Sequence, residues 1–177
     1  MANSNIQSVG ARQTEKLSLT GKERFLGEND LIVSKTDLTG KIIYANKIFM
    51  DISDYTEGEV LGSPHSMIRH PEMPRAIFKL LWQTLESGEE IFAYVVNRCK
   101  NGDHYWVYAH VTPSFDVGGK IIGYHSSRRA PKRDSVNAIV KIYDELRAIE
   151  QAEGRKEGLI SSTAALERDR KSTRLNS

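Results

Sequence analysis

Five runs of β-branched and aromatic residues, divided two and three by a helical segment, constrain the fold of this chain more than any other feature. The runs cover residues 31–36, 41–45, 91–98, 104–115 and 120–128. Neighbouring runs are joined by short turns rich in glycine and aspartate, such as Asn101-Gly102-Asp103. Such short connections predict antiparallel pairing, and therefore one antiparallel sheet of five strands.

The segment between the second and third runs has a helical pattern. Residues 46–62 carry apolar positions at helical spacing interrupted by glycines, which predicts short helices. From Met73 to Ser87 an apolar stripe predicts one longer helix, with Pro74 in its first turn and Gly88 just beyond its end. Segregated strands and helices give an α+β fold in which helices cover one face of the sheet. The space between the two layers is then either a core or a pocket.

Three segments flank this central unit, which spans residues 26–129. Residues 1–25 are polar and without a sustained period, so we expect a flexible arm or cap. Residues 130–153 contain an amphipathic helix with apolar positions at 3-4 spacing, which suits an output or dimerisation surface. Residues 154–177 predict a flexible tail.

Composition excludes several classes of protein. No stretch approaches the roughly 18 apolar residues of a membrane span, and the N-terminus lacks the apolar centre of a signal peptide. The single cysteine, Cys99, allows no disulfide within the chain, so we expect a reducing cytoplasm.

The last ten residues, RDRKSTRLNS, account for much of the net positive charge. They hold four of the 25 basic residues and only one of the 23 acidic residues. They also resemble translated sequencing-adapter read-through, so we expect residues 168–177 to be artefactual. The remaining chain is close to neutral and gives no reason to expect a nucleic-acid partner.

Two segments carry candidate binding chemistry. The loop PHSMIRHPEMP places Arg69 and His70 ahead of a predicted helix, where a phosphate or carboxylate finds positive charge. The alternative is a surface loop whose arginine pairs with a nearby carboxylate. Asn97 lies in an apolar strand and is a candidate buried amide that needs partners, although an edge-strand asparagine facing water is equally compatible.

Catalytic and metal motifs are missing from the sequence. It contains no nucleophile elbow, phosphate-binding glycine loop or zinc-protease helix motif. The five histidines are scattered and have no companion cysteine cluster. We therefore expect neither an enzyme nor a structural metal.

The order of these elements resembles the PAS family. The segments IRHPEMP and NGDHYWV resemble, more narrowly, the flavin-binding PAS domain of bacterial aerotaxis receptors. The likeness covers about residues 26–129. It implies non-covalently bound FAD whose redox state is reported to a chemoreceptor-type signalling partner.

The resemblance also implies a set of cofactor-binding residues. Matched one at a time, they are Asn46 in YANKIF, Arg69 and His70 in the IRHP motif, the helix aromatics Phe78 and Trp82, and the strand amide Asn97. Trp106, in NGDHYWV, is added as a further candidate contact. For both tryptophans the alternative is an ordinary place in the core.

Two departures from the aerotaxis pattern keep other ligands open. Glu72 replaces the family's aspartate, and Ile91 replaces a tryptophan at the start of the following strand. Ile91 and Phe92 favour an alternative, a cofactor-free interaction module whose pocket is filled by its own side chains.

The likeness to other PAS domains adds a further alternative. Cys99 sits at a strand end and does not correspond to the adduct-forming cysteine of flavin photoreceptors of the light-oxygen-voltage type. Haem is a second possible cofactor, with His65 or His70 as ligand, because the long predicted helix has no histidine. Our leading hypothesis is a cytoplasmic, homodimeric FAD sensor of redox state or energy.

Overall fold

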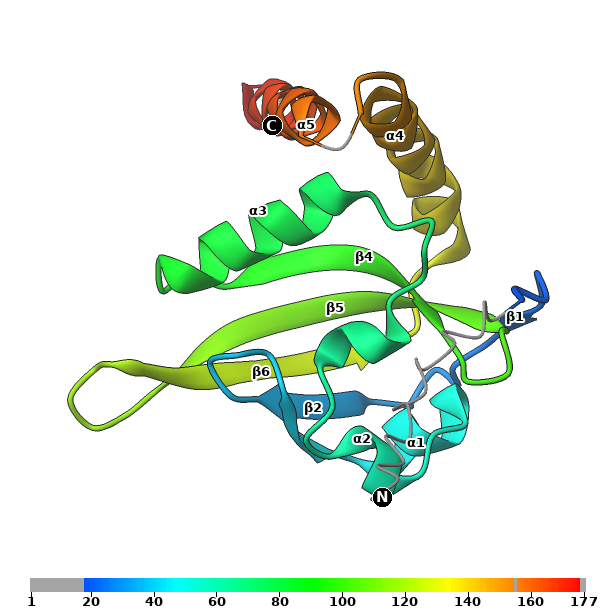
Figure 1. Cartoon of the computed structure of the whole chain (residues 1–177), viewed down its shortest axis with the longest axis vertical. Coiled ribbons are helices and arrows are strands. Elements are labelled where there is room, and N and C mark those ends of the chain that lie inside the picture. The colour runs from blue at the N-terminus through cyan, green and yellow to red at the C-terminus, as the bar shows by residue number, and fades with distance from the viewer. Residues whose placement is uncertain (1–17, 155, 176–177) are drawn as a thin grey trace, which may run out of the picture.

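The computed structural model describes residues 18–154 and 156–175. Its strands are β1 (Glu23–Arg24), β2 (Ile32–Thr36), β3 (Ile42–Ala45), β4 (Ile91–Arg98), β5 (His104–Phe115) and β6 (Ile121–Arg129). Strands β4, β5, β6, β2 and β3 lie side by side in that order, and every pair is antiparallel. The predicted five-stranded antiparallel sheet is therefore confirmed, and Figure 1 shows that it is curled.

A sixth strand, β1, lies in the predicted N-terminal arm and pairs in parallel with the start of β5. Asp103 anchors it: the carboxylate accepts hydrogen bonds from Thr20 Oγ1 at 2.6 Å and Arg24 Nε at 2.9 Å. Because the partner is some 80 residues away, no local pattern marks this strand. The rest of the predicted arm, residues 1–17, lies outside the described residues.

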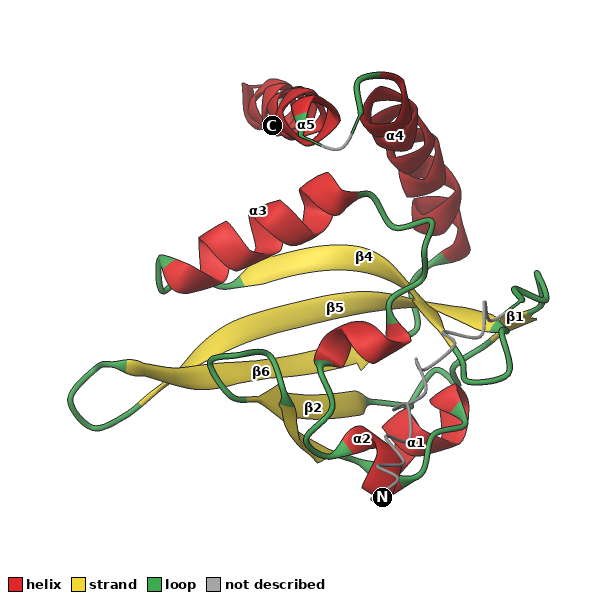
Figure 2. Cartoon of the chain, viewed as in Figure 1, coloured by secondary structure: helices red, strands yellow, loops and turns green. Residues whose placement is uncertain are grey.

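The helices gather on one face and one edge of the sheet (Figures 1 and 2). They are α1 (Lys47–Ser53), α2 (Glu57–Val60), the 3-10 helix η1 (His65–Ile68), α3 (Arg75–Glu86), α4 (Arg133–Ala152) and α5 (Glu157–Leu175). Helix α3 runs along β4, while α1 and α2 lie near β2. Pro74 stands one position before the first residue of α3, at its N-cap, rather than within the first turn as predicted.

Helix α5 differs from the flexible tail predicted after residue 154. It packs beside α4, and α4 and α5 together lie over one end of α3 (Figure 1). Gly158 permits this packing, because a Cβ there would lie 2.7 Å from the Cα and the carbonyl oxygen of Glu150. Ser162 and Leu166 are buried on the same side of the helix. The small, partly polar residues of this face concealed the helix from an argument based on apolar periodicity.

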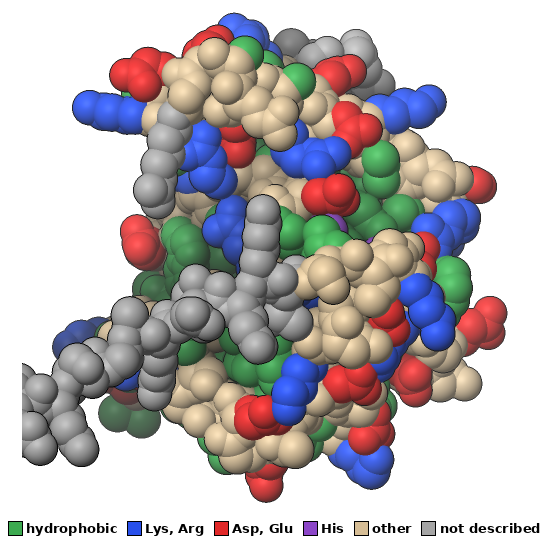
Figure 3. Space-filling view, turned by 45° about the vertical axis from the view of Figure 1, so that its right-hand side comes forward, with side chains coloured by type: hydrophobic (Ala, Val, Ile, Leu, Met, Phe, Trp, Pro, Cys, Tyr) green, Lys and Arg blue, Asp and Glu red, His purple; other side chains and the backbone are tan. Residues whose placement is uncertain are grey.

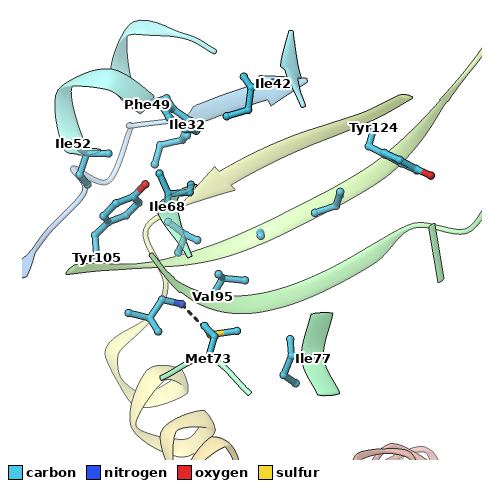
Figure 4. Close-up of a cluster of buried hydrophobic side chains, with 14 of the residues drawn as sticks. Ile32, Ile42, Phe49, Ile52, Ile68, Met73, Ile77, Val95, Tyr105 and Tyr124 are labelled. Carbon is cyan, nitrogen blue, oxygen red and sulfur yellow. Dashed lines mark hydrogen bonds between the residues drawn. The ribbon is translucent and has the colours of Figure 1, made fainter. Parts of the chain in front are cut away.

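The main core fills the space between α1, η1 and the sheet. Phe49, Ile32 and Ile42 are fully buried there, and Tyr105 of β5 reaches in from the inner face of the sheet (Figure 4). Each such side chain contributes about 1.5–3 kcal/mol of burial free energy. Between this core and the apolar side of α3 the packing is incomplete, and a cavity remains.

Candidate functional site: a pocket between α3 and the sheet

A cavity of about 150 Å³ lies between α3 and the inner face of the sheet. Its apolar walls come mainly from α3 and from small or branched residues of β4 and β5, and its polar groups come mainly from β2, β6 and the η1 region. The lining residues are Ser34, Thr36, His65, Ser66, Ile68, Arg69, Phe78, Leu81, Trp82, Leu85, Val95, Asn97, Ala109, Val111, Tyr124, His125, Ser126 and Arg128. An apolar cleft with a few convergent polar groups is the usual form of a small-molecule site.

Strand alternation explains why polar groups reach this cavity. Ser34 of β2 pairs with Ser126 of β6, and Ile32 pairs with Arg128, so all four side chains belong to one face of the sheet. That face is buried, since Ile32 and Ser34 are 0% and 1% exposed. Polar residues therefore occupy inward positions where an ordinary core would place apolar ones.

Arg128 is the most deeply buried charged group of the cavity, with 2% of its surface exposed. Its Nη2 donates a hydrogen bond to Ser34 Oγ, and its guanidinium lies 5.2 Å from the centre of the Phe49 ring. Nε and Nη1 have no hydrogen-bond partner in the described part of the chain. Burial lowers the pKa of Arg128 to about 10, so it remains a cation at neutral pH.

His65 stands next to this arginine. Its Nε2 lies 3.2 Å from Ser34 Oγ, and its ring meets Phe49 edge-on. Burial, together with the positive charge of Arg128, lowers the pKa of His65 to about 3. The imidazole is therefore neutral at physiological pH, and Arg128 is left as the charge on this side of the cavity.

Two further polar groups of the cavity are buried without partners. Asn97 is 4% exposed and Thr36 is 7% exposed. The Asn97 Nδ2 donor and the Thr36 hydroxyl form no hydrogen bond with the described residues. Buried polar groups are nearly always hydrogen-bonded, so three cavity residues, counting Arg128, point to a ligand with matching polar atoms.

Four of the predicted cofactor contacts meet at this cavity: Arg69, Phe78, Trp82 and Asn97. Trp82 packs edge-on against Tyr124 of β6, and the Arg69 guanidinium lies 3.9 Å from the centre of the Phe78 ring. Arg69 is also joined to Asn97 by a backbone bridge. The loop that carries Arg69 is thus tied to the strand that carries the unpartnered amide.

Three predicted contacts do not line the cavity. Asn46 caps α1: its Oδ1 accepts hydrogen bonds from the backbone of Val33 and Phe49. His70 turns away from the cavity and packs edge-on against His104, as successive residues of an extended segment do. Trp106 lies on the opposite face of the sheet, since its neighbour Tyr105 points inward.

Trp106 instead contributes to the seating of α4. Its ring stacks on Tyr143 with centroids 6.3 Å apart, and the Tyr143 hydroxyl donates to the carbonyl oxygen of Tyr94 on the edge strand β4. The amphipathic helix predicted at 134–152 is thus present as α4 and covers that sheet edge.

A second hollow, of about 360 Å³, lies on the other side of Arg69. It is lined by Arg69, Pro71, Met73, Arg75, Arg147, Glu150 and Gln151. Glu150 of α4 binds the start of α3: its carboxylate accepts from the backbone nitrogens of Arg75 at 3.1 Å and Ala76 at 2.9 Å. Arg75 Nε and Ser162 Oγ of α5 complete its partners, so this carboxylate joins three helices.

Burial by itself would raise the pKa of Glu150. The hydrogen bonds from Ala76, Arg75 and Ser162 outweigh burial and lower that pKa, so the carboxylate is ionised at neutral pH. A negative charge at the N-terminal end of α3 is also favoured by the helix dipole.

The departures from the aerotaxis pattern lie outside the cavity. Ile91 and Phe92 do not line it, and Phe92 instead stacks on His110 on the opposite face of the sheet. Glu72 is exposed and lies 3.7 Å from Arg147. The substitutions at 72 and 91 therefore leave the cavity itself intact.

Cys99 is buried, and burial raises its thiol pKa to about 11. Its Sγ donates to the carbonyl oxygen of Ile52. Across residues 18–154 and 156–175, no three His, Cys, Asp or Glu side chains are grouped to hold a metal ion. Within the same residues, no helix has the length and apolar character needed to cross a membrane.

The motifs and strand patterns do not mark the polar residues of β2 and β6 as cavity residues. Ser34, Thr36 and Arg128 fall within predicted strands, and the strand prediction alone does not say which face they occupy. The usable signal was parity: Ser34 and Thr36 share the face of the apolar Ile32 within a five-residue strand.

The chain is similar in sequence to known sensory and regulatory proteins. Residues 42–128 match a protein family described as the PAS fold. The chain is 41% identical over 135 residues to the aerotaxis receptor of Escherichia coli K12, an alignment covering 76% of this chain and 26% of that protein. It is 28% identical over 97 residues to a nitrogen fixation regulatory protein of Klebsiella oxytoca, covering 55% and 20% of the two chains.

Among solved structures, a light-oxygen-voltage domain studied with a flavin analogue superposes with a TM-score of 0.56. The two chains are 22% identical, and the match covers 65% of this chain and 86% of that one. This likeness concerns the fold. The chain spans about a quarter or less of the length of the two sequence relatives named above.

Proposed function

The chain belongs to the PAS family through residues 42–128, and on that premise we propose that it is a cytoplasmic redox sensor that binds FAD. Redox change in the cofactor would be passed to a chemotaxis-type signalling partner. One observation carries the proposal: buried polar groups of Asn97, Thr36 and Arg128 have no hydrogen-bond partner among the described residues, beside a cavity whose walls are partly apolar. An isoalloxazine ring offers donors and acceptors along one edge and apolar faces for Phe78 and Trp82.

The names of the similar proteins support this choice. The relative with 41% identity is an aerotaxis receptor, and the structural neighbour was studied with a flavin analogue. The first name supports an energy- or redox-related signal, and the second supports flavin as the class of cofactor.

The second hollow supports FAD over the shorter FMN. Arg69 lines both cavities, and the second holds two further arginines, Arg75 and Arg147, against the one carboxylate of Glu150. Guanidinium groups recognise phosphate oxygens through paired hydrogen bonds, so a diphosphate fits beside these side chains. A ring in the first cavity and a diphosphate in the second would place Arg69 at their junction.

Helix α3 offers a route for output. One side of it lines the cavity through Phe78 and Trp82, while its first residues are held by Glu150 of α4. A change in the ring's hydrogen bonds would alter the packing of α3, and α4 and α5 would follow because Glu150 and Ser162 join them to it.

The visible spectrum of the purified chain tests cofactor binding. Flavin gives paired bands in the near-ultraviolet and blue, and we expect these bands to bleach on reduction by dithionite. Retention of FAD but not FMN after reconstitution would support the role of the second hollow. A colourless chain that stays colourless after reconstitution with FAD would instead support the cofactor-free interaction module.

Haem is the second candidate cofactor, favoured by one observation. His65 lines the cavity with a pKa lowered to about 3, so its imidazole is neutral and able to act as an iron ligand. A Soret band in the purified chain, lost in a His65→Ala variant, would establish haem in place of flavin.

Arg69→Ala tests the binding site itself. We expect loss of FAD retention with an unchanged far-ultraviolet circular dichroism spectrum, because the guanidinium packs on Phe78 at the cavity wall rather than within the main core. Arg129→Ala, at an exposed position on β6, is the matched control and should keep FAD. Equal FAD occupancy in both variants would contradict a role for Arg69.

We also propose a homodimer formed through the outer face of the sheet. Phe92 is 52% exposed and stacks on His110 with centroids 4.2 Å apart, and Tyr108 continues this aromatic row. Figure 3 shows acidic and basic side chains interspersed over one face of the molecule, so that face is not the basic surface of a nucleic-acid-binding protein. Sedimentation of the wild-type chain and of Phe92→Lys should show a dimer and a monomer respectively.

A further inference from the structure

Arg128 is a buried cation that no carboxylate among the described residues neutralises. It is 2% exposed, and none of the ion pairs formed within residues 18–154 and 156–175 includes it. Buried charges in proteins are normally paired or bound to a ligand, because removing an unpaired charge from water is very costly. The chain thus keeps a charged group, whose burial costs folding free energy, on the inner face of β6, where an apolar residue would pack.

The neighbours of Arg128 are all neutral. Ser34 accepts one of its hydrogen bonds, Phe49 offers only a ring face, and His65 is uncharged. Tyr105 is buried, and burial raises the pKa of its hydroxyl far above neutrality, so this group carries no charge. No described residue therefore supplies the negative charge, while Nε and Nη1 remain available beside the cavity.

We propose that Arg128 is the fixed counter-charge of the pocket and selects a ligand whose buried edge carries, or acquires, negative charge. The inference rests on the proposed function in taking that ligand to be flavin. Charge near the N1 edge of the ring is one of the means by which a protein tunes flavin electronics. Arg128 then favours the reduced cofactor over the oxidised one and sets the potential at which the sensor switches.

The redox step balances without further groups in the pocket. Two electrons from a chemical reductant, dithionite in a redox titration, and one proton from solvent would convert a neutral oxidised ring to a reduced ring with one negative charge. That charge is shared by N1 and the neighbouring carbonyl oxygen. A guanidinium with free N–H donors stabilises this charge without itself changing protonation state.

Arg128→Met tests the proposal, because methionine fills similar space without charge. We expect the equilibrium between reduced and oxidised flavin to shift at least tenfold toward the oxidised form, a fall of about 30 mV in the two-electron midpoint potential. Arg128→Lys should shift it less, since the charge is kept but the planar fork is lost. Arg129→Met removes the same charge one residue away at an exposed position and should leave the potential unchanged.

A second measurement separates this role from a structural one. In the flavin-free chain, Arg128→Met should raise the urea midpoint of unfolding, because it removes an unpaired buried charge. A fall in that midpoint, with an unchanged potential in variants that retain flavin, would overturn the proposal and make Arg128 a structural residue.

The same two measurements keep the inference distinct from the proposed function. A wild-type chain that takes up no FAD contradicts flavin sensing, and the unfolding comparison alone then decides the role of Arg128. A higher midpoint in Arg128→Met supports a counter-charge for some other anion, and a lower midpoint rejects it. A wild-type chain that binds FAD while Arg128→Met keeps its potential rejects the inference and leaves flavin sensing standing.

Discussion

The polar groups beside helix α3 differ in whether the chain itself supplies their hydrogen-bond partners. Toward the sheet, α3 faces a cavity in which polar atoms of Asn97, Thr36 and Arg128 have no hydrogen-bond partner in the described part of the chain. At its N-terminal end, Glu150 accepts hydrogen bonds from two backbone nitrogens, a guanidinium and a hydroxyl. The helical junction is satisfied by the chain itself, whereas no described residue satisfies these polar atoms of the cavity.

This difference suggests how the domain divides stability and response. A junction with satisfied hydrogen bonds is stiff and transmits a displacement, because breaking any one bond exposes a buried group. A cavity with unsatisfied groups is the part whose free energy changes most when a ligand enters or changes charge. Helix α3, 12 residues long, connects the two.

The largest expected effect comes from breaking the junction. Glu150→Ala leaves the backbone nitrogens of Arg75 and Ala76 without their acceptor and unties Ser162 of α5. Hydrogen bonds to charged groups contribute about 1.5–3 kcal/mol each, and we expect a net loss of about 3 kcal/mol in the free energy of unfolding. Urea denaturation followed by circular dichroism measures it.

Glu145→Ala is the matched control for that prediction. Glu145 is an exposed acid on the same helix, so its removal should change the free energy of unfolding by less than about 0.5 kcal/mol. Equal losses in the two variants would mean that the junction contributes nothing beyond the helix propensity of α4.

Lowering the pH should reduce the free energy of unfolding by a smaller amount, through His65 beside the cavity. His65 is neutral in the folded chain, with a pKa lowered to about 3, and takes up a proton when unfolded below its ordinary value of 6.5. The unfolded chain then binds more protons than the folded one, so stability falls as pH falls from 6.5 toward 3. At pH 5 this group alone should cost about 2 kcal/mol relative to pH 7.

Urea midpoints of the flavin-free chain at pH 7 and pH 5 measure that loss. A His65→Asn variant should lose about 2 kcal/mol less than the wild type over the same interval. Glu150→Ala should lose nearly as much as the wild type, because the lowered pKa of Glu150 lies below its ordinary 4.5 and its contribution disappears only at lower pH. An identical pH dependence in wild type and His65→Asn would show that His65 is not the titrating group.

The sequence predicted the sheet well because strand alternation and turn residues are local. All five antiparallel strands and the helix at 134–152 lie where these patterns place them. Helix α5 and strand β1 were not predicted. Helix α5 depends on the close approach of Gly158 to Glu150, and β1 depends on hydrogen bonds to Asp103. Neither distance is visible in a local pattern.

The site was predicted only in part, for a different reason. Four residues matched by motif, Arg69, Phe78, Trp82 and Asn97, line one cavity, and their contact with a cofactor stays a prediction, but motif resemblance does not distinguish the faces of a strand. Asn97 pairs with Tyr105, so Trp106 necessarily points to the opposite face. Arg128 was not among the residues matched to cofactor contacts, and the register between β6 and β2 places it on the buried face.

The smallest expected change concerns Asn97, and it has opposite signs in the two states of the chain. Asn97→Leu removes a buried amide whose Nδ2 has no partner among the described residues, in a side chain that is 4% exposed. An apolar residue of similar size should raise the free energy of unfolding of the flavin-free chain by about 1 kcal/mol. The same variant should bind FAD more weakly, because the polar edge of the ring no longer receives a hydrogen bond from Asn97 Nδ2. Urea midpoints with and without saturating FAD measure both the stability of the variant and its binding of FAD.

A lower midpoint in the flavin-free variant would mean that the amide already has a hydrogen-bond partner in solution. The chain itself would then satisfy the polar groups of the cavity, as it does at the junction on the other side of α3.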